Sequence, residues 1–263
     1  MKQRICALLP PNSPWGELLH WYDSVESTNT LARAQAAQGA PHGTVLIADH
    51  QTGGRGRRGR SFYSPAGTGI YMSVILRPNC RPQELMHLTC AAAAAMCGAV
   101  EKTTGIRPGI KWTNDLVYGK RKLAGILTEL GLGPDGTAAW AIVGIGVNCC
   151  QKAGDFPEEI RDTAGSLAMV SAHKIDRAAL AAAMITALCE MDLTQKSRIM
   201  ESYRRDCVTL GKEISLLRAD GTVRHGRALD VDEDGALLVE FAPGRLETVN
   251  SGEVSVRGMY GYL

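Results

Sequence analysis

Residues 44–76 read TVLIADHQTGGRGRRGRSFYSPAGTGIYMSVIL. Two apolar runs, residues 44–48 and 70–76, enclose a basic loop over residues 54–60 in which four arginines are interspersed with glycines. Short continuous apolar runs bounded by turn formers are typical of buried strands. The stretch therefore predicts two core strands joined by a basic loop, and loops between core strands often carry binding sites.

The basic loop predicts a site for an anion. Glycine lets a backbone approach a ligand closely, and arginine offers a planar, permanently charged donor for carboxylate or phosphate. A solvated, flexible loop is the plainer interpretation of such a charge run, but the flanking strands favour a site.

The same loop contains the dinucleotide spacing G-x-G-x-x-G at Gly54, Gly56 and Gly59. That motif needs a helix directly after the glycines and an acidic residue about 20 positions later. Residues 61–69 are instead rich in turn formers, and the next acidic residue is Glu84. The context therefore argues against a Rossmann site.

Composition bounds the class of protein. The 263 residues are 45% hydrophobic with a net charge of +2, which suits one good core with a small appendage and argues against nucleic-acid binding over the general surface. No apolar run is long enough to cross a membrane, and residues 1–14 lack the pattern of a signal peptide, so we expect a cytoplasmic protein. The eight cysteines form no C-x-x-C pair and are expected to be small buried hydrophobes.

The pattern along the chain predicts three parts: a short leader over residues 1–22, a large α/β body over 23–208 and a small β domain over 209–263. Helices are expected at three places in the body: residues 30–38, residues 82–104 and the segment after Asp176. Ser27 or Thr28 is placed to cap the first of them. Further buried strands are expected over residues 110–112, 124–130 and 138–147. The last part holds short β runs separated by Asp-Gly or Pro-Gly turns, which predict a small barrel: residues 214–217, 223–231, 236–241 and 246–249.

Two further motifs lie beside these strands. Residues 111–115, Lys-Trp-Thr-Asn-Asp, end one strand with an amide and a carboxylate, and Lys122 opens the next strand. A single aspartate suffices for Mg²⁺ when water and phosphate oxygens complete the shell. Each motif taken alone is also compatible with a turn or a solvated strand edge, and so is the Gly-Ile-Gly-Val-Asn run at residues 144–148.

Taken in order, these segments resemble the biotin protein ligases. The resemblance runs from Ser24 to Arg257. It is carried by residues 27–29, Gln51, the basic loop, residues 64–65, 111–115, 122–127 and 144–148.

The resemblance implies an α+β fold, with a mixed sheet flanked by helices, similar to class II synthetases, and a C-terminal SH3-like β-barrel. It implies a ligase that uses ATP and Mg²⁺ to activate biotin as biotinyl-5′-AMP and transfers it to a lysine of a biotin carboxyl carrier protein. Catalytic roles fall to Arg57, Asp115 and Lys122, with Asp115 also expected to hold Mg²⁺. The residues implied to bind biotin are Ser27, Thr28, Asn29, Gln51, Gly54, Arg55, Gly56, Arg57 and Lys122. Those implied to bind ATP are Arg57, Arg58, Trp112, Asn114, Asp115 and Asn148.

Some features depart from the family pattern. Too few residues precede Ser27 for the helix-turn-helix domain of bifunctional members, so we expect a monofunctional ligase. Thr113 stands where many relatives have proline, and Phe62 stands near where many have tryptophan. Homodimers are common among bacterial relatives, and a homodimer is left open here.

Three alternatives remain at this level. A lipoate ligase shares the fold and the acyl-adenylate chemistry. A nucleic-acid-binding module would use residues 55–60 on phosphates, although few aromatic residues are available for stacking. A biotin-binding protein without activity is disfavoured because Asp115 and Lys122 are both present.

Overall fold

The body is built on one mixed sheet. The structure is a computed structural model of the chain, and it describes residues 1–218, 220–251 and 254–258. Seven strands pair in the order β1-β2-β3-β7-β6-β5-β4. β1 and β2 are parallel and every other neighbouring pair is antiparallel, which confirms the predicted mixed sheet. The strands are β1 (Leu19–Val25), β2 (Thr44–Gln51), β3 (Gly69–Leu76), β4 (Gly109–Lys111), β5 (Asp115–Tyr118), β6 (Arg121–Leu132) and β7 (Ala138–Asn148).

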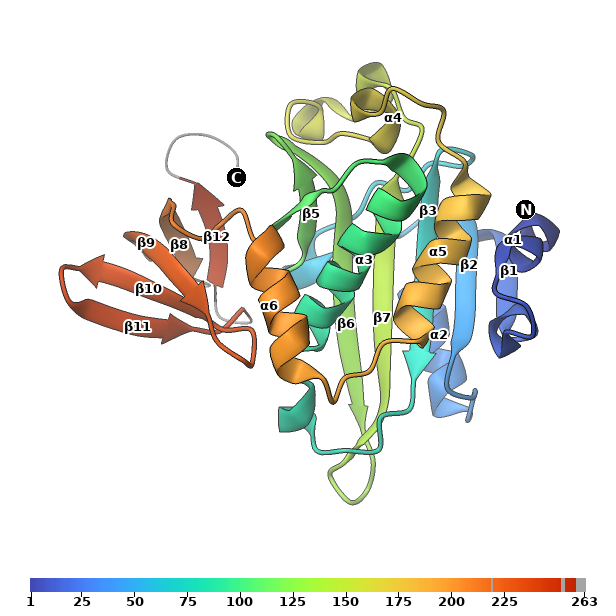
Figure 1. Cartoon of the computed structure of the whole chain (residues 1–263), viewed down its shortest axis with the longest axis horizontal. Coiled ribbons are helices and arrows are strands. Elements are labelled where there is room, and N and C mark those ends of the chain that lie inside the picture. Colours follow the sequence, from blue (N-terminus) through green and yellow to red (C-terminus); the bar gives the residue numbers. More distant parts are fainter. Residues whose placement is uncertain (219, 252–253, 259–263) are drawn as a thin grey trace.

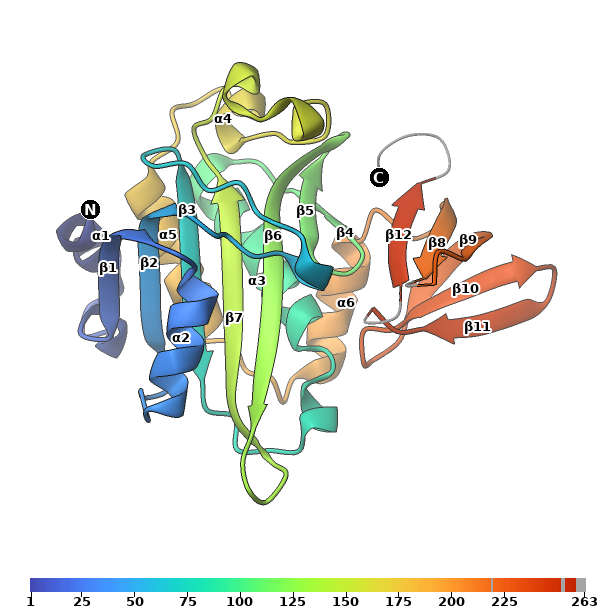
Figure 2. The ribbon, with the colours of Figure 1, turned by 180° about the vertical axis from the view of Figure 1, so that it is seen from behind.

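Helices cover the two faces of this sheet unequally. α3 and α5 lie across one face (Figure 1), whereas the other face carries α2 and the segment that follows β2 (Figure 2). The α-helices are α1 (Lys2–Leu8), α2 (Thr28–Ala37), α3 (Leu88–Thr104), α4 (Leu167–Val170), α5 (Arg177–Cys189) and α6 (Lys196–Asp206). Short 3-10 turns span Pro14–Gly16, Arg57–Gly59, Pro82–Leu85, Ala153–Asp155 and Glu158–Ile160.

Burial explains the sequence of the central strands. All eight residues of β3 are buried because helices cover both of its faces, so its sequence is a continuous apolar run rather than an alternating one. The alanines of α3 include Ala91, Ala92 and Ala93, which are almost fully buried, and their small side chains let the helix approach its neighbours closely. A second, smaller core lies under α2 and contains Ala32, Ala36, Leu46, Ile75 and Ile142.

Two boundaries differ from the expectation. The helix predicted over residues 82–104 is divided, because His87 has φ −80° and ψ 0° and separates the turn Pro82–Leu85 from α3. The expected leader is not set apart from the body: Ile5 and Leu19 are fully buried, and Leu19 pairs with Val45. The predicted boundary at residues 22/23 therefore falls inside β1.

The C-terminal part is an antiparallel sheet beside α6 (Figure 1). Its five strands pair in the order β11-β10-β9-β8-β12. Register shifts occur in the pairing of β10 with β9 and with β11, and such shifts increase local twist. The predicted barrel is not closed, because no pairing within the described ranges joins the edge strands β11 and β12. The strands are β8 (Glu213–Arg218), β9 (Val223–Val231), β10 (Leu237–Ala242), β11 (Arg245–Val249) and β12 (Val254–Gly258).

The helices were compared with what a membrane span requires. Over the described ranges, none of them combines the length and the apolar character that spanning a bilayer requires. The cellular location stays a prediction.

Candidate active site

The basic loop folds back on itself as a hairpin. The Phe62 amide donates to the Gly54 carbonyl over 2.8 Å, and the Gly56 amide donates to the Arg60 carbonyl over 2.7 Å. We call residues 51–64 the arginine hairpin. Its tip is a 3-10 turn in which Arg58 has φ 57°, a left-handed conformation that is uncommon for arginine. In Figure 2 the hairpin crosses in front of β7 and β6 and ends near β4, so it lies on the face of the sheet that α3 and α5 leave open.

Gly54 makes this crossing possible. A Cβ on Gly54 would lie 2.4 Å from the Phe62 carbonyl oxygen and 2.6 Å from Ser64 Oγ. Real Cβ atoms do not approach other atoms so closely, so the two strands of the hairpin can meet only at a glycine. The glycine of the motif is thus required by packing within the hairpin itself.

Arg57 reaches from the tip to the end of β4 and to the C-terminal sheet. Its Nη1 donates to Asn114 Oδ1 over 2.9 Å, and its Nη2 donates to the Ser251 carbonyl. Burial lowers the pKa of the Arg57 guanidinium, and the nearby Asp115 carboxylate opposes that shift. Arg58 also contacts the C-terminal sheet, donating to the Leu217 carbonyl over 3.4 Å. The hairpin tip therefore lies between the body and the C-terminal sheet.

Asp115 and Lys122 form an ion pair beside Arg57. Lys122 Nζ lies 2.7 Å from Asp115 Oδ1, and the two side chains are 30% and 19% exposed. That oxygen is buried and has no hydrogen bond of good geometry among the described residues, so the contact is a close charge pair rather than an aligned hydrogen bond. The sequence motifs at residues 111–115 and 122–127 are thus brought together by the pairing of β5 with β6.

A register shift in this pairing decides which face Lys122 occupies. The pairing of β5 with β6 slips between Leu116 and Val117, and the slip places the Lys122 side chain over Gly125. A Cβ on Gly125 would lie 3.2 Å from Lys122 Nζ. The amine consequently points to the same face as the arginine hairpin.

A second cluster joins the start of α2 to the two strands of the hairpin. Gln51 Oε1 accepts from the Thr28 amide over 2.9 Å, and Gln51 Nε2 donates to Ser64 Oγ over 2.9 Å. Ser27 caps α2, as predicted, and accepts from the Thr30 amide over 3.5 Å. The polar residues expected to hold biotin are therefore linked to one another by hydrogen bonds.

Asn29 is held on all sides by protein groups. Its Oδ1 accepts from Ser73 Oγ over 2.7 Å, and its Nδ2 donates to the Leu127 carbonyl over 3.3 Å and to Glu129 Oε2 over 2.8 Å. A Cβ on Gly144 would come within 1.8 Å of Asn29 Oδ1, so that glycine creates the space for the amide. The ligand contact expected of Asn29 stays a prediction, and the structure gives its side chain a supporting position.

Glu129 is the site residue that the sequence analysis did not identify. Besides Asn29, it pairs with Arg55, whose Nη1 lies 3.3 Å from Glu129 Oε1. The signal was a charged residue inside the apolar run predicted as the strand over residues 124–130. Ser73, an isolated hydroxyl within the equally apolar β3, was the second such signal.

Phe62 occupies the region between the two clusters. Its ring packs over Gly146 and Gly125, whose Cβ atoms would lie 2.4 Å and 3.4 Å from it, and Lys122 Nζ lies 5.9 Å from the ring centroid. Tyr71 packs edge-on at 6.4 Å between centroids. The ring is thus well packed in place of the bulkier tryptophan of many relatives.

Three residues expected at the nucleotide are already engaged within the protein. Trp112 is 5% exposed, and its indole N–H donates to the Gly235 carbonyl of the C-terminal sheet over 2.9 Å. Asn148 Nδ2 donates to the Gly165 carbonyl, and Asn114 Nδ2 donates to the Ile126 carbonyl, both over 2.9 Å. These side chains hold neighbouring segments in place, and their contact with ATP stays a prediction.

The donor set at this site fits Mg²⁺ only in a particular way. No group of three histidine, cysteine or carboxylate residues is placed to hold a metal ion within the described ranges. Asp115 alone offers a carboxylate beside two cations, which suits an ion that takes most of its ligands from water and phosphate oxygens. An all-protein cage is not formed by these residues.

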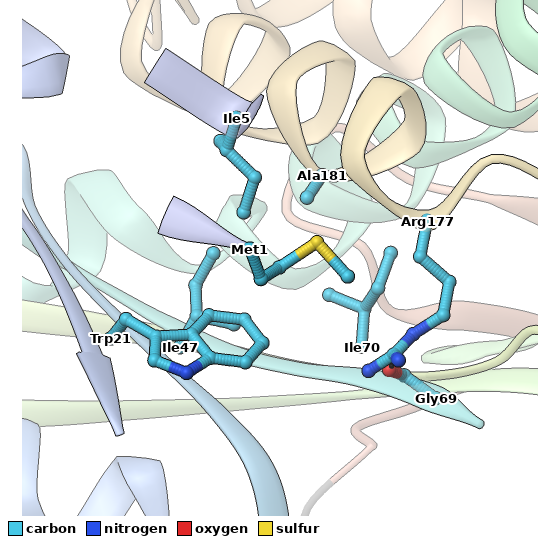
Figure 3. Close-up of a pocket in the computed structure, with 8 residues that line it drawn as sticks. All are labelled: Met1, Ile5, Trp21, Ile47, Gly69, Ile70, Arg177 and Ala181. Atoms are coloured by element: carbon cyan, nitrogen blue, oxygen red, sulfur yellow. Dashed lines mark hydrogen bonds between the residues drawn. The ribbon is translucent and has the colours of Figure 1, made fainter. Parts of the chain in front are cut away.

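A separate hollow lies on the opposite face of the sheet (Figure 3). Its volume is about 10 Å³, and it is lined by Met1, Ile5, Trp21, Ile47, Gly69, Ile70, Arg177 and Ala181. Arg177 is already paired with Asp49 Oδ1 over 2.7 Å and donates to the Gly69 carbonyl over 2.9 Å. The hollow is smaller than a usual ligand pocket, which measures about 300–1,000 Å³, and its charged group is satisfied, so we assign it no ligand.

Both parts of the chain are similar to known protein families. Residues 21–148 match the biotin/lipoate A/B protein ligase family, and residues 209–257 match the biotin protein ligase C-terminal domain. The bifunctional ligase/repressor BirA of Bacillus subtilis is 35% identical over 92% of this chain and 74% of its own length. The biotin–[acetyl-CoA-carboxylase] ligase of Mycobacterium tuberculosis is 33% identical over 87% of this chain and 85% of its length. Among solved structures, the biotin protein ligase of Aquifex aeolicus in complex with biotin and ATP has a TM-score of 0.75 and 30% identity, covering 91% of this chain and 98% of that one.

Proposed function

The chain belongs to the biotin protein ligase family, and on that premise we propose that it activates biotin with ATP and transfers it to a lysine of a biotin carboxyl carrier protein. The observation that carries the proposal is the meeting of Arg57, Asp115 and Lys122 at one point of the sheet face. These side chains come from three separate segments of the sequence. Two cations beside one carboxylate suit a reaction between two anions.

The first half-reaction joins a carboxylate to a phosphate. A biotin carboxylate oxygen attacks the α-phosphorus of ATP, the bond to pyrophosphate breaks, and biotinyl-5′-AMP forms. Arg57 and Lys122 are placed to offset the negative charge that both reactants bring together, and fixed charges of this kind are a principal source of rate enhancement. Mg²⁺, held by Asp115 with water and phosphate oxygens, would supply further positive charge to the phosphates.

The second half-reaction needs a neutral amine. The carrier lysine attacks the carbonyl carbon of the mixed anhydride, the new C–N bond forms, and AMP leaves with the electrons of the broken C–O bond. On this proposal Asp115 is the carboxylate that favours loss of the proton from the amine. The arginine hairpin lies over Asp115 and Lys122, and its cover would limit hydrolysis of the adenylate.

The carrier protein, the cytoplasmic location and a homodimer remain predictions. The relatives named as biotin–[acetyl-CoA-carboxylase] ligases support a carboxylase carrier as the acceptor. The match to a family that also contains lipoate ligases keeps lipoate as the alternative substrate to test.

The proposal is tested by transfer to a purified biotin carboxyl carrier domain. The chain is mixed with the carrier, ATP, Mg²⁺ and either biotin or lipoate, and the intact mass of the carrier is measured. A biotin-sized gain that requires ATP is expected. A gain with lipoate on its own carrier, and none with biotin, would assign the chain to lipoate instead.

A further inference from the structure

We propose that Glu129 is a positioning residue that sets the affinity of the site for biotin, acting through Arg55 and Asn29. The inference rests on the proposed function and extends it to a residue that has no part in the chemistry. Glu129 is unexpected at this position, because its carboxylate lies on the sheet face where two anionic substrates would bind.

Each oxygen of the Glu129 carboxylate has its own partner. Oε2 accepts from Asn29 Nδ2 over 2.8 Å, and Oε1 pairs with Arg55 Nη1 over 3.3 Å. The side chain is 20% exposed, so these contacts are partly shielded from water. Hydrogen bonds to a charged acceptor are stronger than neutral ones, and a partly buried carboxylate that lost them would be costly.

Through Asn29 the carboxylate is joined to a continuous network. Ser73 Oγ lies 2.7 Å from Asn29 Oδ1 and 2.8 Å from Thr28 Oγ1. Because an amide oxygen only accepts, the Ser73 proton points to Asn29, which leaves the Thr28 hydroxyl to donate to Ser73 or Gln51. The network thus extends from Glu129 through α2 and β3 to Gln51.

The network holds the arginine hairpin at two points. Gln51 binds Ser64 across the base of the hairpin, and Arg55 ties its first strand to β6. The groups implied to hold biotin are therefore fixed in relation to each other by one carboxylate. Holding a site in its binding geometry before the ligand arrives raises affinity by reducing the cost of ordering it.

The charge of Glu129 acts far from the reacting atoms. The Lys122 amine lies over Gly125, which is four positions from Glu129 on β6 and therefore about 13 Å away at the usual rise of a strand. This exceeds the Debye length of about 8 Å at physiological salt, so Glu129 acts more weakly on Lys122 than on its direct partner Arg55. It neutralises Arg55, and the positive charge offered to the substrates is thereby concentrated at the Arg57 end.

The test compares the biotin KM with kcat in variants of the full chain. In Glu129→Gln the carboxamide can still accept from Asn29 but lacks the charge for Arg55, and we expect the biotin KM to rise about tenfold, the scale of one charge-assisted hydrogen bond. The kcat at saturating biotin and the KM for ATP should change less than about twofold. Glu129→Leu should raise the biotin KM further. All rates are measured well below the melting temperature of each variant, with the folded fraction checked by circular dichroism.

Arg55→Met and the double variant Glu129→Gln/Arg55→Met test whether Glu129 and Arg55 act together on biotin binding. If Glu129 acts through Arg55, the double variant Glu129→Gln/Arg55→Met should have a biotin KM no higher than the worse single variant. Glu84→Gln is the matched control, since Glu84 pairs with Arg81 at the same distance of 3.3 Å on an unrelated surface, and its KM should stay unchanged.

The outcomes separate the two proposals. An inactive wild-type chain would overturn the ligase proposal and this inference with it. An active wild type whose Glu129→Gln variant keeps its biotin KM, or loses kcat instead, would overturn only the role of Glu129. Additive effects in the double variant would likewise contradict a shared route through Arg55.

Discussion

Two places in the arginine hairpin are held in different ways: the Arg57 end, at its tip, and the Arg55 end, in its first strand. Arg55 is paired with a carboxylate, Glu129, whereas the hydrogen-bond acceptors of Arg57 among the described residues are uncharged, namely the Asn114 amide and the Ser251 carbonyl. The carboxylate offsets part of the positive field of Arg55, whereas neutral acceptors leave the field of Arg57 without such an offset. Arginines that look equivalent in the sequence thus differ in their partners, and on the proposed function only Arg57 is left to serve the substrates.

The largest expected effect comes from removing charge at the Arg57 end. Asp115→Asn keeps the shape of the side chain but removes the partner of Lys122 and the carboxylate for Mg²⁺. We expect adenylate formation to fall about 100-fold, a loss of roughly 2.7 kcal/mol in transition-state stabilisation. Pyrophosphate release measures this step, and near-normal release from a folded variant would contradict the role assigned to Asp115.

The Arg55 end can be broken by filling space rather than by removing charge. Gly144→Ala places a methyl group within 1.8 Å of Asn29 Oδ1, so Asn29 must move and its bonds to Ser73 and Glu129 must weaken. We expect biotin to bind about 30-fold more weakly by calorimetry. Gly98→Ala, in α3 with no atom near the added Cβ, is the control and should bind biotin normally. Equal affinities in the two variants would show that the position of Asn29 does not matter.

The two ends should also differ in how they retain the adenylate. Arg57→Gly removes the donor proposed to hold the phosphate, so the adenylate should escape and labelling of bystander proteins by biotin should rise about tenfold. Arg55→Met should weaken biotin binding without that rise. Streptavidin blots of a mixture containing a non-substrate protein measure the difference, and unchanged labelling by Arg57→Gly would refute it.

The smallest expected effect concerns His87, a buried histidine of the body that lies near Gly235 of the C-terminal part. His87 is 2% exposed, its Nδ1 has no partner within the described residues, and a Cβ on Gly235 would lie 3.9 Å from its Cα. Burial lowers the pKa of His87, and Lys196 lowers it further, against the opposing effects of the bond to Leu193 and of Asp234 and Glu233.

Because the pKa of His87 is lowered in the folded protein, the free energy of unfolding depends on pH. Below about pH 6.5 the unfolded chain binds a proton at His87 more readily than the folded chain, so stability is complete above that pH and falls as the pH drops. Between pH 7.5 and 5.5 we expect the melting temperature of the wild type to fall about 2 °C more than that of His87→Gln. His173→Gln, at an exposed histidine, should follow the wild type. Parallel behaviour of all three proteins would exclude His87 as the cause.

Much of the architecture could be predicted from local pattern. The apolar runs of β2, β3 and β7 and the cap at Ser27 follow from composition and spacing, and the structure confirms them. The break at His87 could not be predicted, because the ring binds the Leu193 carbonyl from a segment more than a hundred residues away. Whether the C-terminal strands close into a barrel could not be predicted for a similar reason, since closure depends on whether two distant edge strands meet.

The chemical groups that the protein holds follow from its sequence alone: a basic glycine-rich loop, an Asn-Asp pair and a lysine at the start of a strand. Tertiary structure decided which of these groups face each other. Glu129 is the one charged residue in the apolar run of residues 124–130, and only the pairing of β6 with β7, with Asn29 lying over Gly144, brings it to Arg55. The reason is physical: charge and hydrogen-bonding capacity are properties of single side chains, whereas the partner that uses them is set by the packing of segments far apart in the chain.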